Sequence, residues 1–290
     1  MIALIACTYN QPKDLDAYLW SLRAQTQSEF HIWIADDGSK PDTARVIELH
    51  QHDFFGDRLH HVWHEDNGYR KCLILNKTMV KVKAQAPKWL IFTDSDLIVH
   101  PHFIEDHVSM AGPKRLFMGR RVDLGAQVSE WIRNHPHSLF NWPFYLKVLT
   151  SAFKSLEFAP SVEVSDIERA RGVTRHVKRL FRIENSTMAR LLGYHRVTDL
   201  LGSNFSICPE LFHQINGFNE ALEHYWGEDG DLFVRARNAG ADISGRKGYA
   251  VQLHLWHQPR KPKPDAEASY LKCLKNTQYV RCESGLSNHG

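Results

Sequence analysis

The chain has 290 residues, of which 43% are hydrophobic and 24% are charged, and its formal net charge is +3 at pH 7. This length and composition fit one large soluble α/β domain, or one domain with a substantial insertion. The small net charge gives no argument for nucleic-acid binding, and no run of about 18 apolar residues predicts a transmembrane helix. Five cysteines, an odd number with no Cys-x-x-Cys pair, indicate free thiols in a reducing compartment such as the cytoplasm.

The first hundred residues alternate between short apolar segments and amphipathic ones. Apolar runs bounded by turn residues predict strands at residues 2–7, 31–35, 58–63 and 89–93. Apolar side chains at helical spacing predict helices over residues 12–25 and 70–83. Strands separated by helices of this length indicate a mainly parallel sheet that is covered by helices on both faces.

The segment at residues 120–200 breaks this alternation. Asn141 can cap a helix that carries Pro143 in its first turn. One face of that helix gathers large apolar side chains, those of Trp142, Tyr145, Leu146, Leu149, Phe153 and Leu156, opposite Lys147, Ser151 and Lys154. Residues 169–182 then contain six Lys/Arg residues and no acidic one. Either an amphipathic helix packs on the core before a solvated basic helix, or the region forms a surface for anionic lipid or a phosphorylated glycan.

Regular structure is expected again after residue 200. Strands are predicted at residues 202–208 and 250–253. Residues 228–239 have the pattern of a helix, which Gly240 would terminate. The part after Pro259 is rich in lysine and proline and then helical in pattern, which predicts a C-terminal tail.

Two carboxylates, Asp94 and Asp96, follow the predicted strand at residues 89–93. Open α/β sheets bind ligands at the carboxyl ends of their strands, and carboxylate oxygens suit Mg²⁺ or Mn²⁺ bound together with diphosphate oxygens. His254 and His257 could complete such a site, because a neutral imidazole is a common metal ligand. A solvated turn and two structural histidines are the alternative interpretation.

Acidic residues also follow an earlier strand and begin a later helix. Asp37, after the strand at residues 31–35, could accept a hydrogen bond from a nucleobase N–H or a ribose hydroxyl, although an Asp-Gly turn needs no ligand. Glu228, Asp229 and Asp231 stand at a predicted helix N-terminus, where the helix dipole stabilises acids. Three acids within four residues exceed what a cap requires, and one of them could act as a general base towards a sugar hydroxyl.

The order of these motifs resembles that of GT-A-fold glycosyltransferases of the family-2 type, with a C-terminal half similar to the galactosyltransferase and chondroitin-polymerase type. The resemblance covers residues 1–118 and 202–260. It rests on eight motifs: Ala6-Cys7-Thr8-Tyr9-Asn10, Asp36-Asp37-Gly38-Ser39, Asp66-Asn67-Gly68-Tyr69-Arg70 with Asn76, Asp94-Ser95-Asp96, Gly202-Ser203-Asn204-Phe205-Ser206, Gly217-Phe218-Asn219-Glu220, Trp226-Gly227-Glu228-Asp229 and His254-Leu255-Trp256-His257.

The resemblance implies an α/β fold of the GT-A type, with a Rossmann-like, mainly parallel central sheet flanked by helices and a helical insertion. The glycosyltransferase domain would span residues 1–258. Within it, residues 1–118 would form the nucleotide-sugar-binding half, residues 119–200 the basic and aromatic insertion, and residues 201–258 the acceptor-binding half. A C-terminal tail would follow at residues 259–290.

The resemblance also implies a role for each motif residue on the donor side. Tyr9 and Asp37 would contact the base and ribose of a nucleoside diphosphate, usually UDP. Arg70 would approach the diphosphate, and Asn76 would help to shape the pocket. Asp94 would face the ribose or the donor sugar.

For the metal, Mn²⁺ or Mg²⁺, the resemblance implies Asp96 as a ligand. His257 would be a further ligand, because it fits the family pattern better than His254 does.

On the acceptor side, Asp229 would be the catalytic base, while Trp226 and Glu228 would line the acceptor site. Asp231 could compete for the acceptor role. Asn219 stands where the family usually has aspartate. This difference weakens the match of that motif but does not affect the assignment of Asp229 as the base. A single base opposite the leaving group predicts an inverting, single-displacement transfer, with the metal and Arg70 stabilising the departing diphosphate.

Two other functions stay open at this point. A nucleotidyltransferase also pairs carboxylates with a metal beside a parallel sheet, but it normally has a glycine-rich phosphate loop, and residues 6–11 contain no glycine. A non-catalytic nucleotide- or glycan-binding module would keep the fold without turnover. Nucleic acid is not an expected partner, since only residues 169–182 favour it.

The basic, aromatic insertion and the lack of a membrane span predict a cytoplasmic enzyme that visits the inner face of a bacterial plasma membrane. Its acceptor there would be a glycan or a lipid-linked glycan, as in the synthesis of surface polysaccharide or lipopolysaccharide.

Overall fold

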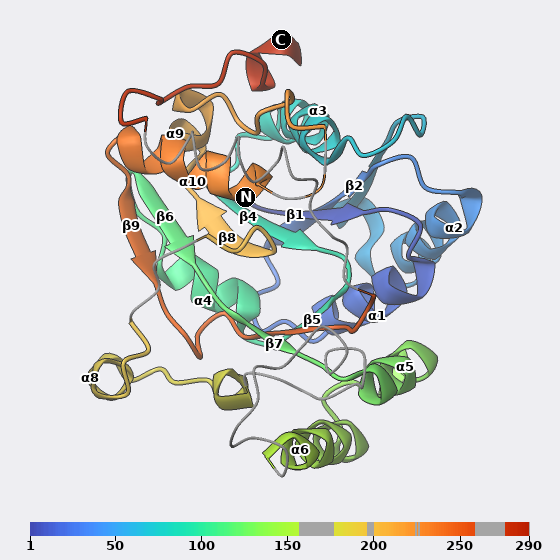
Figure 1. The fold of residues 1–290 in the computed structure, drawn as a ribbon. Helices are drawn as coiled ribbons and strands as arrows, with labels where there is room; N and C mark the ends of the chain where they lie inside the picture. Colours follow the sequence, from blue (N-terminus) through green and yellow to red (C-terminus); the bar gives the residue numbers. More distant parts are fainter. Residues whose placement is uncertain (157–176, 196–199, 224, 226, 259–275, 290) are drawn as a thin grey trace.

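A seven-stranded sheet forms the centre of the molecule (Figure 1). The computed structural model describes residues 1–156, 177–195, 200–223, 225, 227–258 and 276–289. The strand order is β3-β2-β1-β4-β8-β6-β9. In chain order the strands are β1 (Ile2–Thr8), β2 (Phe30–Asp36), β3 (Leu59–Trp63), β4 (Trp89–Asp94), β6 (Arg115–Met118), β8 (Asn204–Ile207) and β9 (Asp242–Gly245).

The sheet is mainly parallel, as predicted. β1 runs parallel to β2 and β4, β2 to β3, and β6 to β9, whereas β8 is antiparallel to both of its neighbours. The four N-terminal strands match the predicted ones to within one residue at each end. Leu4 and Ile5 of β1 are completely buried although they point to opposite faces, which is expected where helices cover both faces of a parallel sheet.

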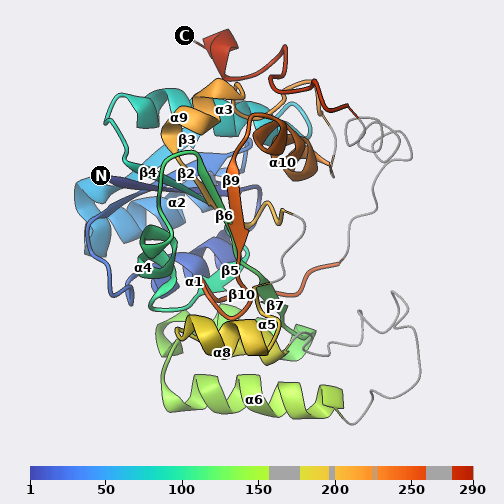
Figure 2. The same ribbon diagram turned by 90° about the vertical axis from the view of Figure 1, so that its left-hand side faces the viewer.

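Helices lie on both faces of this sheet, which confirms the second part of the prediction. α3 (Lys71–Lys83), α9 (Pro209–Gln214) and α10 (Glu228–Asn238) lie on one side in Figures 1 and 2, and α1 (Pro12–Leu22) and α4 (Phe103–Ser109) on the other. α2 (Pro41–His50) packs against α1. Under α9, Phe92 of β4 stacks on Phe205 and Phe212, with ring centroids 4.9 and 5.3 Å apart.

A small second sheet follows the carboxyl end of β4. Its order is β5-β10-β7, formed by β5 (Leu97–Val99), β7 (Arg121–Asp123) and β10 (Gln252–His254). The sequence predicts only the last of these strands, because three-residue segments are too short to show a period. The antiparallel pairing of β10 with β5 sets His254 opposite Leu97, the residue after Asp96.

Two helices, α5 (Ala126–Asn134) and α6 (Trp142–Leu156), pack at the lower end of the molecule in Figure 2. Asn141 caps α6 as predicted, with its Oδ1 accepting from the Phe144 N–H at 3.2 Å. The interpretation that the predicted apolar face of α6 covers the core is wrong, because Trp142 and Leu146 are 73% and 47% exposed, whereas Phe144 and Val148 are 1% exposed. The alternative, a surface for anionic lipid or a phosphorylated glycan, stays a prediction. The helix is apolar on two neighbouring faces. It packs against α5 through Phe144 and Val148, which lie one helical turn apart.

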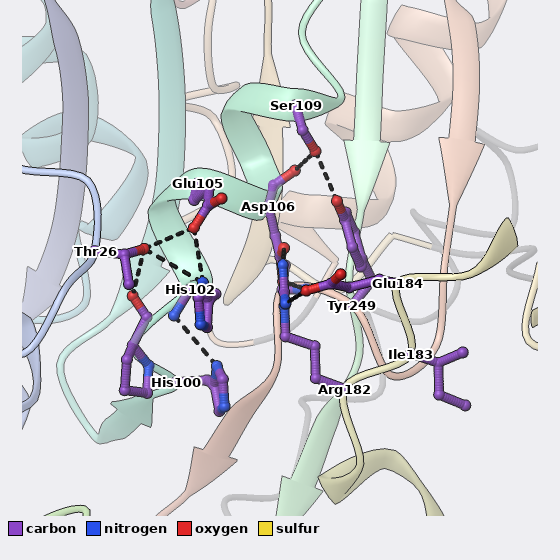
Figure 3. Close-up of polar contacts among 12 residues, drawn as sticks. Thr26, His100, His102, Glu105, Asp106, Ser109, Arg182, Ile183, Glu184 and Tyr249 are labelled. Carbon is purple, nitrogen blue, oxygen red and sulfur yellow. Dashed lines mark hydrogen bonds and ion pairs between the residues drawn. The ribbon is translucent and has the colours of Figure 1, made fainter.

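Residues 177–195, near the end of the predicted insertion, contain a 3₁₀ turn (Val177–Leu180) and α8 (Ser186–Leu191). Figure 3 shows the anchor of this segment on α4, where the Arg182 guanidinium donates to both carboxylate oxygens of Asp106 at 2.6 to 3.1 Å. Asp106 is completely buried and also accepts from the Ala250 N–H at 2.9 Å. The predicted basic helix at residues 169–182 lies mostly outside the described residues, and its last residue, Arg182, is paired rather than solvated.

The described end of the chain packs on the domain. The Leu286 N–H donates to the Asn216 carbonyl at 2.9 Å, and Cys282 is buried. Part of the predicted tail after residue 258 therefore contacts the domain. The helical pattern predicted after Pro259 falls on residues 259–275, which lie outside the described residues.

Candidate active site

Three neighbouring parallel strands end at the same edge of the central sheet. The register of β1, β2 and β4 sets Thr8 beside Asp36 and Cys7 beside Asp94. The acidic turns after β2 and β4 therefore emerge on either side of the end of β1. This edge is where open α/β sheets bind their ligands.

Asp96, His254 and His257 form a group whose ligand atoms all lie within 4.8 Å of one another. The Nε2 atoms of His254 and His257 are 3.3 and 3.4 Å from Asp96 Oδ2. The other oxygen, Asp96 Oδ1, is buried and has no hydrogen-bond partner among the described residues. A buried oxygen without a partner costs free energy unless a ligand satisfies it. One carboxylate and two imidazoles form a donor set that fits a divalent metal.

Both histidines reach this carboxylate, although the resemblance favours His257 over His254. His254 is the last residue of β10, and His257 lies in the loop that follows. α5 holds this loop, because Arg133 donates to the Trp256 carbonyl at 2.8 Å. The predicted insertion at residues 119–200, which includes α5, therefore helps to hold the loop that carries His257.

Pairing of opposite charges dominates the titration of this group. Burial alone would raise the pKa of Asp96, but His254 and His257 hold it well below its usual value. Burial alone would lower the pKa of His254, whereas Asp96 and Asp123 raise it to about 9. A metal ligand must be deprotonated, so cation binding is expected to displace the proton that His254 carries at neutral pH.

Asp37 follows β2 and is held through both carboxylate oxygens. Its Oδ1 lies 2.8 Å from His64 Nε2, and its Oδ2 accepts from the backbone N–H of Arg70 at 2.9 Å. Burial raises the pKa of Asp37, and these two hydrogen bonds oppose the rise. Nearby, the Tyr9 hydroxyl donates to Asp66 at 3.0 Å. A carboxylate fixed in this way keeps lone pairs that can accept from a nucleobase or a ribose.

Arg70 lies at the rim of this region. Its guanidinium pairs with Glu223 at 2.9 Å. It also lines a pocket whose walls mix basic, acidic and apolar side chains, namely His64, Glu65, Asn67, Arg70, Leu73 and Lys77. Since His64 and Arg70 both contact Asp37, this pocket adjoins the candidate base-binding carboxylate.

Lys71, which none of the sequence motifs includes, lies between Asp94 and Glu228. Its Nζ is 2.9 Å from Asp94 Oδ1 and 3.4 Å from Glu228 Oε1. Burial alone would lower the pKa of Lys71, but these two carboxylates hold it well above its usual value. The Tyr69 hydroxyl also donates to Glu228 Oε1, at 3.2 Å. One ammonium group therefore joins the end of β4 to the start of α10.

Asp229, in the first turn of α10, is held by backbone N–H groups. Its Oδ2 accepts from Gly202 at 3.0 Å and its Oδ1 from Gly230 at 2.8 Å. Burial raises the pKa of Asp229, the charge of Glu228 raises it further, and the Gly202 N–H and Lys71 oppose the rise. A carboxylate with a raised pKa and a fixed position suits a general base.

Two further sequence-predicted site residues have partners within the protein. Asn76 is completely buried, and its amide donates to the Phe218 carbonyl at 2.8 Å and accepts from the Phe218 N–H at 3.0 Å. Asp231 is buried and pairs with Arg235 at 2.6 Å. Their polar atoms are hydrogen-bonded or ion-paired within the protein, and the pocket and acceptor roles that the resemblance implies stay predictions. Trp226, predicted at the acceptor site, lies outside the described residues.

Several solved structures have the same fold as this chain. A mannosyltransferase from Pyrobaculum calidifontis in complex with GDP-Man and Mn²⁺ has a TM-score of 0.53 at 14% identity, over 92% of this chain and 59% of that one. S. aureus TarS gives 0.55 at 16%, over 94% of this chain and 38% of that one. Residues 1–349 of TarS with UDP-GlcNAc give 0.54 at 15%, over 89% and 59%. This chain thus spans less than two thirds of each relative's length.

Family comparisons cover both halves of the chain. Residues 185–258 match the N-terminal domain of galactosyltransferase, and residues 3–161 match glycosyl transferase family 2. No curated protein matches the chain. The seven-stranded sheet with its flanking helices is the GT-A fold of the solved glycosyltransferase structures. Since the family-2 match extends over more than half of its length, this chain belongs to glycosyl transferase family 2.

Proposed function

We propose that this chain transfers a sugar from a nucleoside diphosphate sugar, with UDP as the nucleotide, to a hydroxyl group of a glycan. The supporting observation is the Lys71 bridge. It links Asp94, two residues before Asp96, to Glu228, the residue before Asp229. A candidate metal group and a candidate base are therefore held together at one edge of the sheet.

On the donor side, Tyr9 and Asp37 would hold the base and the ribose, and Asp94 would face the ribose or the sugar. Arg70 would exchange Glu223 for the diphosphate. Of the related structures, one contains GDP-Man and another UDP-GlcNAc, so this fold accepts both nucleotides. The match of the C-terminal half to a galactosyltransferase domain favours UDP.

Asp96, His254 and His257 would hold the divalent cation, and the unpartnered Asp96 Oδ1 fits such a ligand. Two imidazole nitrogens among three protein donors favour Mn²⁺ over Mg²⁺, because Mg²⁺ prefers oxygen ligands. When bound, the cation would stabilise negative charge on the departing diphosphate.

Asp229 would act as the base in a single displacement. The acceptor oxygen bonds to the anomeric carbon, the bond from that carbon to the diphosphate breaks, and the hydroxyl proton passes to Asp229. Attack opposite the leaving group inverts the anomeric configuration. Retention through a covalent intermediate would need a second carboxylate as nucleophile, and the nearest acid in sequence beyond Glu228, Asp231, is engaged by Arg235.

A thermal-shift screen of UDP- and GDP-sugars, with and without Mn²⁺, tests the proposal. A bound ligand raises apparent stability by mass action, so a donor should raise the melting temperature only when Mn²⁺ is present. The donor found is then tested for release of its nucleoside diphosphate. Binding without any turnover would favour a non-catalytic module, and release of pyrophosphate from a nucleoside triphosphate would favour a nucleotidyltransferase.

We also propose that the acceptor is a lipid-linked glycan of a bacterial surface polysaccharide or lipopolysaccharide, met at an anionic membrane. α6 exposes Trp142, Tyr145 and Leu146 beside the exposed Lys147, a combination that suits a bilayer interface. No helix in the described part of the chain is long and apolar enough to cross a membrane. Trp142→Ser/Leu146→Ser should reduce cosedimentation with phosphatidylglycerol vesicles, and equal cosedimentation of this variant and the wild type would refute the proposal.

A further inference from the structure

Lys71 stands where helix electrostatics disfavour a cation. It is the first residue of α3, and the N-terminus of a helix carries a partial positive charge. Its side chain is only 16% exposed, and removing an ammonium group from water is costly unless anions compensate. Asp94 and Glu228 supply this compensation. The two carboxylates, and not the helix, therefore stabilise the charged ammonium group of Lys71 at this position.

These two carboxylates belong to different parts of the proposed site. Asp94 ends β4 and comes two residues before Asp96, while Glu228 begins α10 directly before Asp229. The strand that would bind the donor and the helix that carries the base are separated by more than a hundred residues of sequence. In the folded chain they meet at the Nζ atom of Lys71.

We propose that Lys71 is a positioning residue, which ties Asp94 on the donor side to Glu228 on the acceptor side and so sets how the nucleotide is held relative to the base. The inference rests on the proposed function, since that function assigns Asp94 to the donor. Without Lys71, Asp94 would face the ribose or the sugar as a carboxylate without an ion pair, and its negative charge would repel the diphosphate of the same nucleotide. The affinity for the donor would therefore fall. The affinity of the Asp96, His254 and His257 group for metal would stay unchanged, because among the described residues Lys71 forms no ion pair with this group.

The experiment separates positioning from charge balance. Lys71→Met alone leaves the buried carboxylate of Glu228 and the partly buried one of Asp94 without their ammonium partner, which can unfold the protein. Lys71→Met/Glu228→Gln removes one positive and one negative charge, so the net charge of the three groups stays as in the wild type. Calorimetric titrations measure the affinity for Mn²⁺ alone and then for UDP in saturating Mn²⁺, and thermal denaturation checks folding. Lys81→Met is the matched control, because Lys81 is an exposed lysine of the same helix.

We expect the double variant to bind Mn²⁺ alone as the wild type does but to bind UDP at least about fivefold more weakly, as the loss of one charged contact implies. Glu228→Gln alone leaves Lys71 on Asp94 and should keep or strengthen UDP binding. Lys81→Met should match the wild type in both titrations.

Two results would overturn the inference. One is wild-type UDP affinity in the double variant. The other is an equal loss of Mn²⁺ and UDP binding, which would make Lys71 a general structural residue. If the wild type itself fails to bind UDP in Mn²⁺, the proposed function is wrong, and this inference falls with it.

Discussion

Gly202 approaches Asp229 so closely that no side chain fits between them. Its backbone N–H donates to Asp229 Oδ2 at 3.0 Å, and a Cβ atom at position 202 would lie 2.9 Å from the Cβ of Asp229. The residue two positions before β8 therefore fixes the carboxylate at the start of α10. Because both segments are backbone-bound parts of the fold, the position of the proposed base depends on this glycine.

Gly202→Ala should displace Asp229 and slow transfer. A shift of a reacting group by about 1 Å can reduce a rate about a hundredfold, so we expect kcat to fall by about ten- to a hundredfold. UDP affinity in Mn²⁺ should change little. Gly112→Ala is the control, because its Cβ would meet no atom nearer than 3.9 Å. Equal kcat values for the two variants would contradict the placement of the base.

Asp229→Asn should remove the proton acceptor and keep the fold. The amide has nearly the shape of the carboxylate, and its oxygen can still accept from the Gly202 N–H. We expect kcat to fall by about 10²- to 10⁴-fold, the usual contribution of a general base. Calorimetry should show UDP and Mn²⁺ binding close to that of the wild type. A variant that transfers sugar at the wild-type rate would remove Asp229 from the mechanism.

The acidic side of the pH–rate profile should report the protonation of Asp229. Burial and the charge of Glu228 raise the pKa of this carboxyl, so it takes up a proton at a higher pH than an ordinary aspartate. The rate should fall as the pH drops through this raised pKa, because the base must be ionised. Glu228→Gln removes one cause of the rise and should move the acidic limb to lower pH. Rates are measured at saturating Mn²⁺, and an unmoved limb would argue against the assignment.

Arg182→Met should destabilise the domain. It leaves the buried carboxylate of Asp106 without its guanidinium, and removing one partner of a buried ion pair costs about 3–5 kcal/mol. Asp106→Asn added to this variant should recover part of the loss, because it removes the unpaired charge. Urea denaturation measures both variants. A loss under about 1 kcal/mol in the single variant, as for an exposed pair, would show that the contact in Figure 3 does not anchor the insertion.

The N-terminal half of the fold follows from the sequence, since the central strands are continuous apolar runs and the helices between them have clear spacing. The small sheet does not, because residues such as Leu97 to Val99 form a strand only through pairing with β10. The sequence also does not predict which face of α6 is buried. Its apolar residues cover two faces, and the contact with α5 selects Phe144 and Val148.

Most candidate site residues can be found from motif order, because carboxylates after strands and before helices mark the ligand-binding edge. A motif does not show which contacts its side chains make: the Asn76 amide bonds the backbone of Phe218, which lies more than a hundred residues away in sequence. Lys71 was missed because its partners, Asp94 and Glu228, are distant in sequence. A signal for it did exist: a lysine in the first turn of a helix, where acids are favoured, requires an external partner.

Titration of Mn²⁺ with and without UDP, followed by electron paramagnetic resonance of the free ion, tests whether Asp96, His254 and His257 bind a metal that is used with the nucleotide. We expect the wild type to bind Mn²⁺ more tightly when UDP is present. We also expect Asp96→Asn to raise the Kd for Mn²⁺ by at least about tenfold, as the loss of a metal-site residue does. Mn²⁺ affinity that is the same in Asp96→Asn and in the wild type would contradict the assignment of Asp96, His254 and His257 as the metal site.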